Sequence, residues 1–556
     1  MNKKVCSFPI LFALLALLIG TCAVVFPASA QAAPTSTGSI TVSGTVASSY
    51  DAYQIFSANV VDGDSDAKIA TDLAWASDAV RDAALPVLHS AGMPNSQTTA
   101  QEAAEWLNTD SHLTSALSAQ LARSLQSSGA EPVALNAGTT AELSCGYWLI
   151  VADDDAIAQG ETGTAPIMAL VGGSAVTVKP KAATPKVAKY VLEDSTAAWQ
   201  KAADATVADD LYWRLSATVP AGLTAYDTYT VRFVDTMSAG LDPSKVAASV
   251  RVYAAAGADG GFDVVQTGKD GRAGTEPAKG WTDITAQCAT KVAADGKTFT
   301  VRTGDLIAAL GGADAFTAGA RVVAVYNAPL NSACNHGIAK GNPNEVYLRY
   351  PRSPFADQSG DAGFTRTPSD DACAYTWDLA LTKRGSDGDK PLARAVLSIA
   401  DDRGRTLAAD GTWDAEGKAT VTTGEDGRVT VSGVDSGKLE VRELKAPKGY
   451  TAFEGTRSVT VKAEGLDVDQ VAAAKPKLTI TAESPLRADS ADGSTGSLEA
   501  SLINTPTGTP PSITTGGFMP STGDMAMYAA AAAAVAGAAL LVVALLVKRG
   551  GGSHKE

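Results

Sequence analysis

The sequence predicts a mainly β protein built from tandem β-sandwich domains, with helical insertions in the first domain. Stretches such as Ser39–Ser43 and 375–383 alternate apolar and polar residues, which is the period of a strand buried on one face. Apolar residues recur instead at helical spacing in two segments, about 67–90 and 98–125. The 556 residues leave room for about three domains of ordinary size once both chain ends are set aside.

Both chain ends carry the pattern of targeting segments. Residues 1–32 combine two lysines, an apolar core and Ala28-Ser29-Ala30, which predicts a secretory signal peptide. At the other end, the apolar run 526–547 is long enough to cross a bilayer as a helix, and the basic tail 548–556 is expected on the cytoplasmic side. We therefore expect an exported chain that stays tethered by its C-terminus.

The composition excludes several classes of function. A formal net charge of −15 argues against nucleic acid as a partner. None of the four histidines lies in a metal-ligand or triad-like spacing, and no glycine-rich phosphate loop precedes a helix. The sequence therefore predicts no metal site, no cofactor and no turnover enzyme, and it argues against a secreted hydrolase.

The first region, 33–180, is expected to be β-rich with an inserted helical part. The stretches that should form its strands are Ser39–Ser43, Tyr50–Phe56, Gly146–Val151 and 166–178. Trp75 and Trp106 fall at helical spacing within the two Ala-rich segments. We expect both rings in the core rather than at a binding site.

The middle region, 183–370, places two charges where apolar side chains point. Lys189 lies on one strand face with Val187 and Val191, and Asp235 ends a similar apolar row. Burying an isolated charge is costly, so each group should have a partner in the core.

The third region, 374–507, carries the sharpest pattern. Lys383, Glu443 and Asn504 each end an alternating apolar row, on the first, a middle and the last expected strand. One such residue usually marks a strand end that reaches the surface, but three of them predict a buried polar trio. A buried Lys–Glu ion pair beside a satisfied asparagine is the alternative interpretation.

Residues 508–524 form a Pro/Gly/Thr-rich linker that ends in Met519-Pro-Ser-Thr-Gly523. Together with the apolar run and the basic tail, this pentapeptide resembles the cell-wall sorting signal of Gram-positive surface proteins, with Met519 where the family usually has Leu. The resemblance implies that a sortase transpeptidase cuts between Thr522 and Gly523. An ordinary C-terminal membrane anchor is the alternative.

The stretch Val176-Thr-Val-Lys-Pro-Lys181 resembles the pilin motif of Gram-positive shaft subunits, with Lys179 in place of the usual Tyr. In that family the final lysine attacks the sortase thioester that carries the threonine of another subunit. The matching residue is Lys181, which precedes a linker of small residues. Lys179 and Lys186 lie close enough in sequence to be alternative acceptors.

The second and third regions resemble the collagen-adhesin-type, Ig-like domains of major (backbone) pilins, of the A type and B type respectively. In the B type a lysine and an asparagine join in an isopeptide bond beside an acidic residue, which implies Lys383 and Asn504 with Glu443 as the catalytic acid. A buried lysine amine loses its charge more readily, and a protonated Glu443 can polarise the amide carbonyl and relay a proton. The close packing of these groups supplies proximity.

For the A-type middle domain the same resemblance assigns the lysine to Lys189 and the acid to Asp235. By strand alternation with Val346, Arg352 stands where the family has its asparagine. We therefore expect no cross-link in this domain and a buried Lys189/Asp235/Arg352 charge cluster in its place. Asn344 also lies on the inward face and is a further candidate.

Four cysteines remain after removal of the signal peptide, and in an exported protein they can form disulfides. Cys288 with Cys334 is the first candidate pair, and Cys334 with Cys373 is nearly as good. The pairing with Cys145 stays open.

The resemblance as a whole implies a structural subunit of a cell-wall-anchored surface fimbrium. Sortase would join Lys181 of one copy to Thr522 of the next, giving a head-to-tail covalent filament. The implied partners are sortase, copies of this chain, minor or tip pilins, peptidoglycan and a host surface molecule. The alternative is a monomeric wall-anchored adhesin that binds a host protein or glycan.

Overall fold

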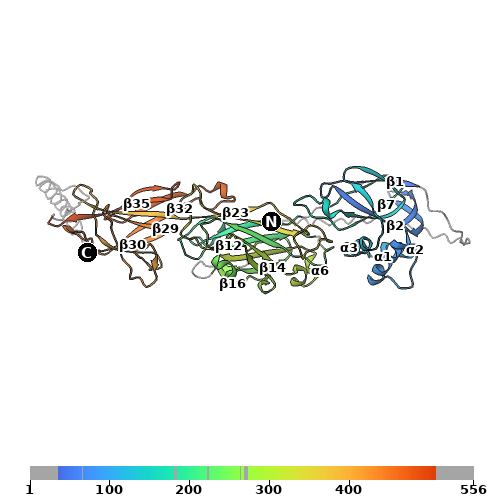
Figure 1. The fold of residues 1–556 in the computed structure, drawn as a ribbon, viewed down its shortest axis with the longest axis horizontal. Helices are drawn as coiled ribbons and strands as arrows, with labels where there is room; N and C mark the ends of the chain where they lie inside the picture. The colour runs from blue at the N-terminus through green and yellow to red at the C-terminus, as the bar shows by residue number, and fades with distance from the viewer. Residues whose placement is uncertain are drawn as a thin grey trace, which may run out of the picture.

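Three β-rich bodies lie in a row and give the molecule an elongated shape (Figure 1). The computed structural model describes residues 36–64, 67–109, 111–180, 184–221, 224–262, 265–267 and 273–508. We call 36–180 the first body, 184–376 the middle body and 377–508 the third body. Each packs β-sheets around an apolar core, so the expected mainly β fold class with tandem sandwiches is confirmed.

Several sequence predictions fall outside the described residues. They are the signal peptide 1–32, Lys181, the sorting signal with Thr522 and Gly523, the apolar run 526–547 and the tail 548–556. Within the part of the chain that the structure describes, no helix is both long enough and apolar enough to cross a membrane.

The first body contains two sheets and a helical layer. One sheet has the order β5-β1-β8, and the other has the order β3-β2-β6-β7 with β4 added to β2. The strands are β1 (Thr37–Val42), β2 (Ser49–Asp62), β3 (Lys68–Trp75), β4 (Val133–Asn136), β5 (Thr140–Ser144), β6 (Gly146–Ala152), β7 (Ile167–Val171) and β8 (Val176–Val178). The helices are α1 (Asp78–Ser90), α2 (Ala100–Asn108) and α3 (Ser115–Ser127). Their apolar faces pack on β2 and β6.

The helical prediction is correct in kind but wrong in extent. The expected helix over 67–90 begins only at Asp78, because Lys68–Trp75 pairs with β2 as strand β3. The side chain of Ser77 caps α1 by accepting a hydrogen bond from the Val80 amide at 3.2 Å. The second expected helix, 98–125, breaks into α2 and α3, and Thr114 caps the latter. Pairing with a neighbouring strand outweighs the helical preference of an Ala-rich sequence here.

Both tryptophans of this region pack as expected. Trp75 contacts Phe56, with ring centroids 4.9 Å apart, and its indole N–H donates to the Thr98 carbonyl at 3.1 Å. Trp106 stacks on His112 at 4.3 Å. Both rings are partly buried against the apolar cluster beneath the helices.

The middle body is a sandwich of two large sheets. One has the order β10-β9-β12-β20-β14-β17, and the other has the order β11-β23-β21-β13-β19-β18 with β22 added to β21. The strands are β9 (Lys186–Glu193), β10 (Ala198–Gln200), β11 (Ala202–Asp204), β12 (Tyr212–Val219), β13 (Arg232–Met237), β14 (Arg251–Ala256), β17 (Thr282–Asp283), β18 (Ala289–Val292), β19 (Thr298–Arg302), β20 (Ala320–Asn327), β21 (Asn342–Pro351), β22 (Phe364–Arg366) and β23 (Asp370–Tyr375). A separate ribbon pairs β15 (Val265–Thr267) with β16 (Ala273–Pro277), and the short helices are α4 (Val246–Ser249), α5 (Leu306–Ala309) and α6 (Ala313–Phe316).

The third body is a smaller sandwich. One sheet has the order β29-β24-β35-β31 with β34 added to β35, and the other has the order β27-β26-β25-β30-β32-β33 with β28 added to β25. The strands are β24 (Trp377–Gly385), β25 (Val396–Ala400), β26 (Thr406–Leu407), β27 (Trp413–Asp414), β28 (Val421–Thr422), β29 (Arg428–Val434), β30 (Gly437–Lys445), β31 (Tyr450–Thr451), β32 (Thr456–Glu464), β33 (Lys477–Ala482), β34 (Leu486–Asp492) and β35 (Ser497–Pro506). Its first strand, β24, and its last strand, β35, pair in parallel.

Candidate functional site

The predicted polar trio of the third body comes together in its core. In the parallel pair, Lys383 on β24 lies opposite Leu502 on β35, and Asn504 follows two residues later on the same face. Glu443 reaches the two from β30 of the facing sheet. The three side chains are almost completely buried, with Lys383 at 0%, Asn504 at 2% and Glu443 at 6% exposure.

The contacts within the trio link all three side chains. Lys383 Nζ contacts Asn504 Oδ1, and it lies 3.4 Å from Glu443 Oε1. Asn504 Nδ2 donates to the same Glu443 oxygen at 2.9 Å. The sequence predicted that Glu443 would donate to the amide carbonyl, whereas in the structure the carboxyl touches the lysine nitrogen and the amide nitrogen. The second carboxyl oxygen of Glu443 accepts from the Phe453 amide at 3.1 Å, which fixes the side chain.

Burial changes the acidity of this lysine. Desolvation lowers the pKa of Lys383 to about 8, and the nearby Glu443 carboxyl offsets part of that shift. The uncharged amine, which carries a free lone pair, is therefore more populated near neutral pH than in an exposed lysine. The arrangement provides a nucleophile, an amide electrophile and one carboxyl group that can exchange protons with both nitrogens.

The middle body holds a second buried polar cluster. Lys189 on β9, Asp235 on β13, Tyr326 on β20 and Asn344 on β21 all have 0% exposure. Lys189 Nζ contacts Asp235 Oδ2 and donates to the Tyr326 hydroxyl at 2.9 Å. Asn344 Nδ2 donates to the same hydroxyl at 2.7 Å, and the hydroxyl in turn donates to Asp235 Oδ2 at 3.0 Å. The predicted burial of Lys189 and Asp235 with a partner is confirmed.

Electrostatics in this second cluster resemble those in the third body. Desolvation lowers the pKa of Lys189 to about 8, against the opposing effect of Asp235. Desolvation also raises the pKa of Asp235, although Lys189 and Tyr326 act in the other direction. Two buried acceptors, Asp235 Oδ1 and Asn344 Oδ1, have no hydrogen-bond donor. Such groups are costly to bury, so a hydrogen-bond donor at either oxygen would lower the free energy of the cluster.

The expected Lys189/Asp235/Arg352 charge cluster is wrong. Arg352 lies just beyond the end of β21 and turns toward the first body, where it donates to the Asp154 carbonyl at 3.1 Å and lies 3.8 Å from Asp155. Asn344 fills the place in the core that the sequence assigned to Arg352. The middle body therefore holds a buried asparagine in the same cluster as its buried lysine.

Tyr326 is a residue of this cluster that sequence reasoning missed. It ends an inward row that includes Val322 and Ala324, the same pattern that singled out the trio of the third body. A tyrosine at the end of an apolar row is common in cores, so the pattern alone did not mark it.

The backbone of Lys189 is also held by charged side chains. Its N–H donates to Asp370 Oδ2 at 2.6 Å, and its carbonyl accepts from Lys201 Nζ at 2.8 Å. Lys201 and Asp370 form an ion pair with each other. These contacts fix β9 at the point from which the Lys189 side chain enters the core.

The expected disulfides are not formed. The four cysteines in the described residues, Cys145, Cys288, Cys334 and Cys373, are free thiols. The pairings of Cys288 with Cys334 and of Cys334 with Cys373 are therefore wrong. Desolvation raises the pKa of the Cys288, Cys334 and Cys373 thiols to about 11, which makes them poor nucleophiles at neutral pH.

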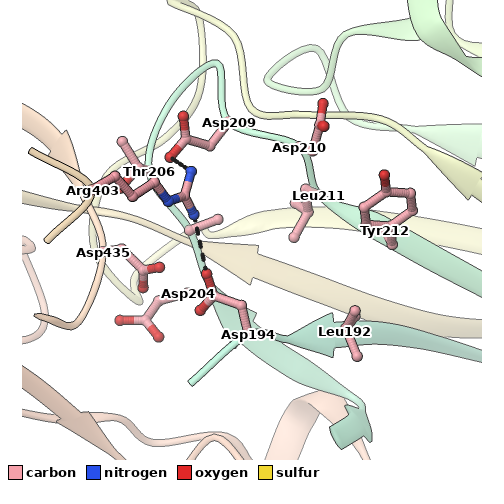
Figure 2. A pocket seen from close by; sticks show the side chains of 11 residues that line it. Leu192, Asp194, Asp204, Thr206, Asp209, Asp210, Leu211, Tyr212, Arg403 and Asp435 are labelled. Atoms are coloured by element: carbon pink, nitrogen blue, oxygen red, sulfur yellow. Dashed lines mark hydrogen bonds and ion pairs between the residues drawn. The ribbon is translucent and has the colours of Figure 1, made fainter. Parts of the chain in front are cut away.

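An acid-rich pocket lies at the junction of the middle and third bodies (Figure 2). The pocket is lined by buried Asp204 of the middle body and by Asp435 of the third body. Glu193, which is also buried, accepts a hydrogen bond from the Asp204 amide at 3.2 Å. Asp204 Oδ2 accepts hydrogen bonds from the Trp377 indole N–H at 2.6 Å and from the Ser436 amide at 2.9 Å. Desolvation, followed by repulsion from Asp204, raises the pKa of Glu193 to about 7 and raises that of Asp435 strongly.

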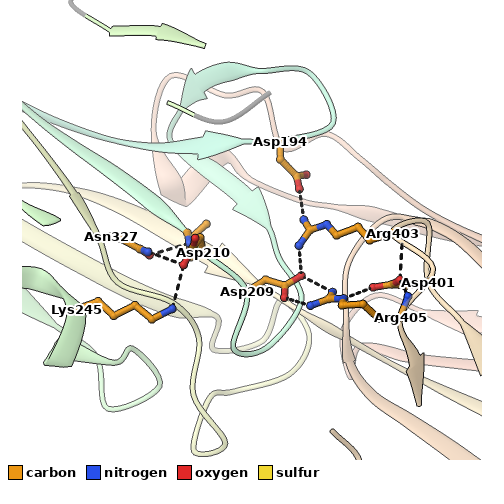
Figure 3. Close-up of polar contacts among 9 residues, drawn as sticks. Asp194, Asp209, Asp210, Lys245, Asn327, Asp401, Arg403 and Arg405 are labelled. Atoms are coloured by element: carbon orange, nitrogen blue, oxygen red, sulfur yellow. Dashed lines mark hydrogen bonds and ion pairs between the residues drawn. The ribbon is translucent and has the colours of Figure 1, made fainter. Parts of the chain in front are cut away.

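Ion pairs connect the same two bodies beside this pocket (Figure 3). Arg405 of the third body binds Asp209 of the middle body with two nitrogens, at 2.5 and 2.8 Å. Arg403 lies 2.7 Å from Asp209 and 3.5 Å from Asp194. Bidentate arginine–carboxylate contacts hold a fixed geometry, so they limit rotation of one body against the other.

The described residues contain no group of three or more His, Cys, Asp or Glu side chains arranged to hold a metal ion. The acidic side chains at the junction instead contact backbone amides, hydroxyl groups and arginines.

Comparison with known proteins finds a family model that one segment resembles. Residues 378–475 match the SpaA prealbumin-like fold domain. This part of the third body is therefore similar to a SpaA-type prealbumin-like domain. The matched segment includes Lys383 and Glu443 and ends before Asn504.

Further similarities are to a surface protein and to solved pilin structures. A stretch of 143 residues is 29% identical to the trypsin-resistant surface T6 protein of Streptococcus pyogenes, and the match covers 24% of this chain and 24% of that protein. The chain thus spans about a quarter of the length of that relative. The T6 backbone pilin structure from S. pyogenes has 17% identity and a TM-score of 0.45, covering 85% of this chain and 98% of that one. The full-length major pilin SpaD of Corynebacterium diphtheriae has 15% identity and a TM-score of 0.42, with 86% and 100% coverage.

Proposed function

We propose that this chain is the backbone subunit of a covalently polymerised surface pilus and that internal isopeptide bonds stiffen it. The observation that carries the proposal is the buried trio of Lys383, Glu443 and Asn504, which connects the first and last strands of the third body. The sorting signal and the pilin motif in the sequence supply the means of polymerisation. The SpaA-type domain and the partial similarity to a trypsin-resistant surface protein also support this assignment.

In the third body, uncharged Lys383 Nζ attacks Cγ of Asn504. The Nζ–Cγ bond forms, the Cγ–Nδ2 bond breaks, and Nδ2 leaves as ammonia. Glu443, which lies within 3.4 Å of Nζ and 2.9 Å of Nδ2, takes the proton from the first nitrogen and gives it to the second. The reaction happens once within one chain, so it is a maturation step rather than enzymatic turnover.

The position of this bond has a mechanical consequence. Tension along the filament would enter the third body at β24 and leave it at β35, which are paired in parallel. A bond between Lys383 and Asn504 carries that tension directly from the first strand to the last. The segment between these two residues, which are 121 positions apart, is then shielded from the applied force.

We propose a second isopeptide bond, between Lys189 and Asn344, in the middle body. The pair is fully buried, the lysine pKa is lowered to about 8, and Asp235 contacts the lysine nitrogen. This proposal replaces the expectation of no cross-link, because Asn344 rather than Arg352 faces the lysine cluster.

The sorting signal and the pilin motif account for polymerisation. Sortase cleaves after Thr522 and joins its carboxyl group to the Lys181 amine of another copy, giving a head-to-tail filament. The same signal attaches the base of the filament to peptidoglycan, and minor or tip pilins complete it. The chain itself is a sortase substrate and a structural subunit at the cell surface.

The intact mass of the secreted chain tests the internal bonds. Each isopeptide bond lowers the mass by one ammonia, and peptide mapping locates it. We expect two losses, at Lys383–Asn504 and Lys189–Asn344. A chain with no loss would refute the isopeptide mechanism.

A separate experiment tests polymerisation in cells that express the matching sortase. Lys181→Ala should abolish the high-mass ladder on denaturing gels, whereas Lys179→Ala and Lys186→Ala are the matched controls and should leave it intact. A wild-type chain that runs only as a monomer would favour the wall-anchored adhesin instead.

A further inference from the structure

The two polar clusters differ in how far the acidic side chain reaches. In the third body, Glu443 touches both the lysine nitrogen and the amide nitrogen. In the middle body, Asp235 is one methylene shorter; it contacts Lys189 Nζ, and its second oxygen has no partner. A different group therefore has to move the proton between the two nitrogens of the middle body.

The Tyr326 hydroxyl lies between those nitrogens. It is 2.9 Å from Lys189 Nζ and 2.7 Å from Asn344 Nδ2, and it donates to Asp235 at 3.0 Å. One hydroxyl has a single proton to give and can accept two hydrogen bonds, so these three contacts use its whole capacity. Phe299 packs edge-on against the Tyr326 ring at 4.8 Å and holds it in place.

We propose that Tyr326 is a catalytic residue of isopeptide formation in the middle body, where its hydroxyl relays the proton from Lys189 to the leaving nitrogen of Asn344. The inference rests on the proposed Lys189–Asn344 bond. It names a residue with no counterpart among the contacts of the third-body trio, where Glu443 performs this transfer alone.

The transfer balances without any further reactant. Uncharged Lys189 Nζ attacks Cγ of Asn344, and the Tyr326 hydroxyl turns its proton from Asp235 Oδ2 to Nδ2, whose lone pair is free once the carbon is tetrahedral. In one concerted step the ammonium gives a proton to the Tyr326 oxygen and the hydroxyl proton passes to Nδ2. The Cγ–Nδ2 bond then breaks, and ammonia leaves. Tyr326 ends in its original neutral form, and desolvation, which raises its pKa well above 10, disfavours a phenolate intermediate.

Because Tyr326 transfers the proton, Asp235 has a different role in the reaction. Both Asp235 Oδ1 and Asn344 Oδ1 are buried acceptors without a donor. A proton on Asp235 Oδ1 would supply a donor for the developing oxyanion on Asn344. Burial, which raises the pKa of Asp235, favours that proton. Asp235 thus polarises the carbonyl while Tyr326 relays the proton.

The test follows bond formation in the freshly purified full-length secreted chain, by intact mass and by mapping of the Lys189–Asn344 peptide over time. Tyr326→Phe removes only the hydroxyl. Tyr229→Phe is the matched control, because Tyr229 is equally buried in the same core and its hydroxyl has no partner. The third-body bond in the same molecule is an internal reference, and the tryptophan fluorescence of the whole chain, compared with wild type, scores folding.

We expect Tyr326→Phe to slow formation of the middle-body bond by roughly 10²-fold or more, with no change in the third-body bond or in the Tyr229→Phe chain. Adding Asp235→Glu to Tyr326→Phe should restore part of the rate, because the longer carboxyl can reach both nitrogens as Glu443 does. An unchanged rate in folded Tyr326→Phe would overturn the role of Tyr326 and leave the bond itself intact. A wild-type chain without the Lys189–Asn344 peptide would overturn the bond and the inference together.

Discussion

Replacing Lys383 by Met tests how much stability the third-body cross-link provides. Methionine keeps the apolar stem but removes the nucleophile, so no bond can form and no unpaired lysine charge is buried. Asn504 and Glu443 retain their hydrogen bond of 2.9 Å. The effect on stability therefore comes mainly from the lost cross-link.

The size of that effect follows from the length of chain that the bond closes. Lys383 and Asn504 are 121 residues apart, and in the chain-entropy model a loop of this length contributes about 5 kcal/mol through the unfolded state. For a domain of this size that free energy corresponds to roughly 15–20 °C in unfolding temperature. Calorimetry of the secreted chain should show the third-body transition lowered by this amount in Lys383→Met.

The matched control is Lys445→Met, which removes an exposed lysine from β30 of the same body. It should change the free energy of unfolding by no more than about 0.5 kcal/mol. A Lys383→Met chain that unfolds at the wild-type temperature would refute the argument that a covalent bond closes this loop.

Three further predictions follow from the site and the junctions. Glu443→Gln should prevent the third-body ammonia loss while the fold is retained, and a normal mass deficit in this variant would contradict its role as the proton carrier. Because the pKa of Glu193 is raised to about 7 by burial and by nearby Asp204, docking of the middle and third bodies should be strongest below pH 7 and weaken as the pH rises through that value. Small-angle scattering should detect the resulting bending, and Asp435→Asn should flatten its pH dependence; a pH-independent shape in the wild-type chain would refute this. Arg352→Ala should leave the Lys189–Asn344 peptide unchanged in the mass map, since Arg352 contacts the first body. Loss of that peptide would indicate that Arg352 contributes to the buried cluster.

Strand alternation correctly predicted which side chains point into the core wherever the residue lies within a regular strand. Lys383, Glu443 and Asn504 each continue an apolar row, and successive side chains of a strand point to opposite faces, so their burial was predictable. The same argument placed Lys189 and Asp235 in the core. It failed at Arg352, because β21 ends at Pro351 and the alternation no longer applies beyond it.

The sequence by itself determined the mainly β class, the burial of Lys189, and the buried trio of the third body, since all of these depend on local periodicity. Only the tertiary structure decided which amide faces Lys189, where Arg352 points, that Lys68–Trp75 is a strand, and that the four cysteines of the described residues are free thiols. It also brought Tyr326 from β20 between Lys189 and Asn344, which lie on β9 and β21. These features depend on which strands become neighbours, and that pairing is set by packing of the whole sandwich rather than by any single segment.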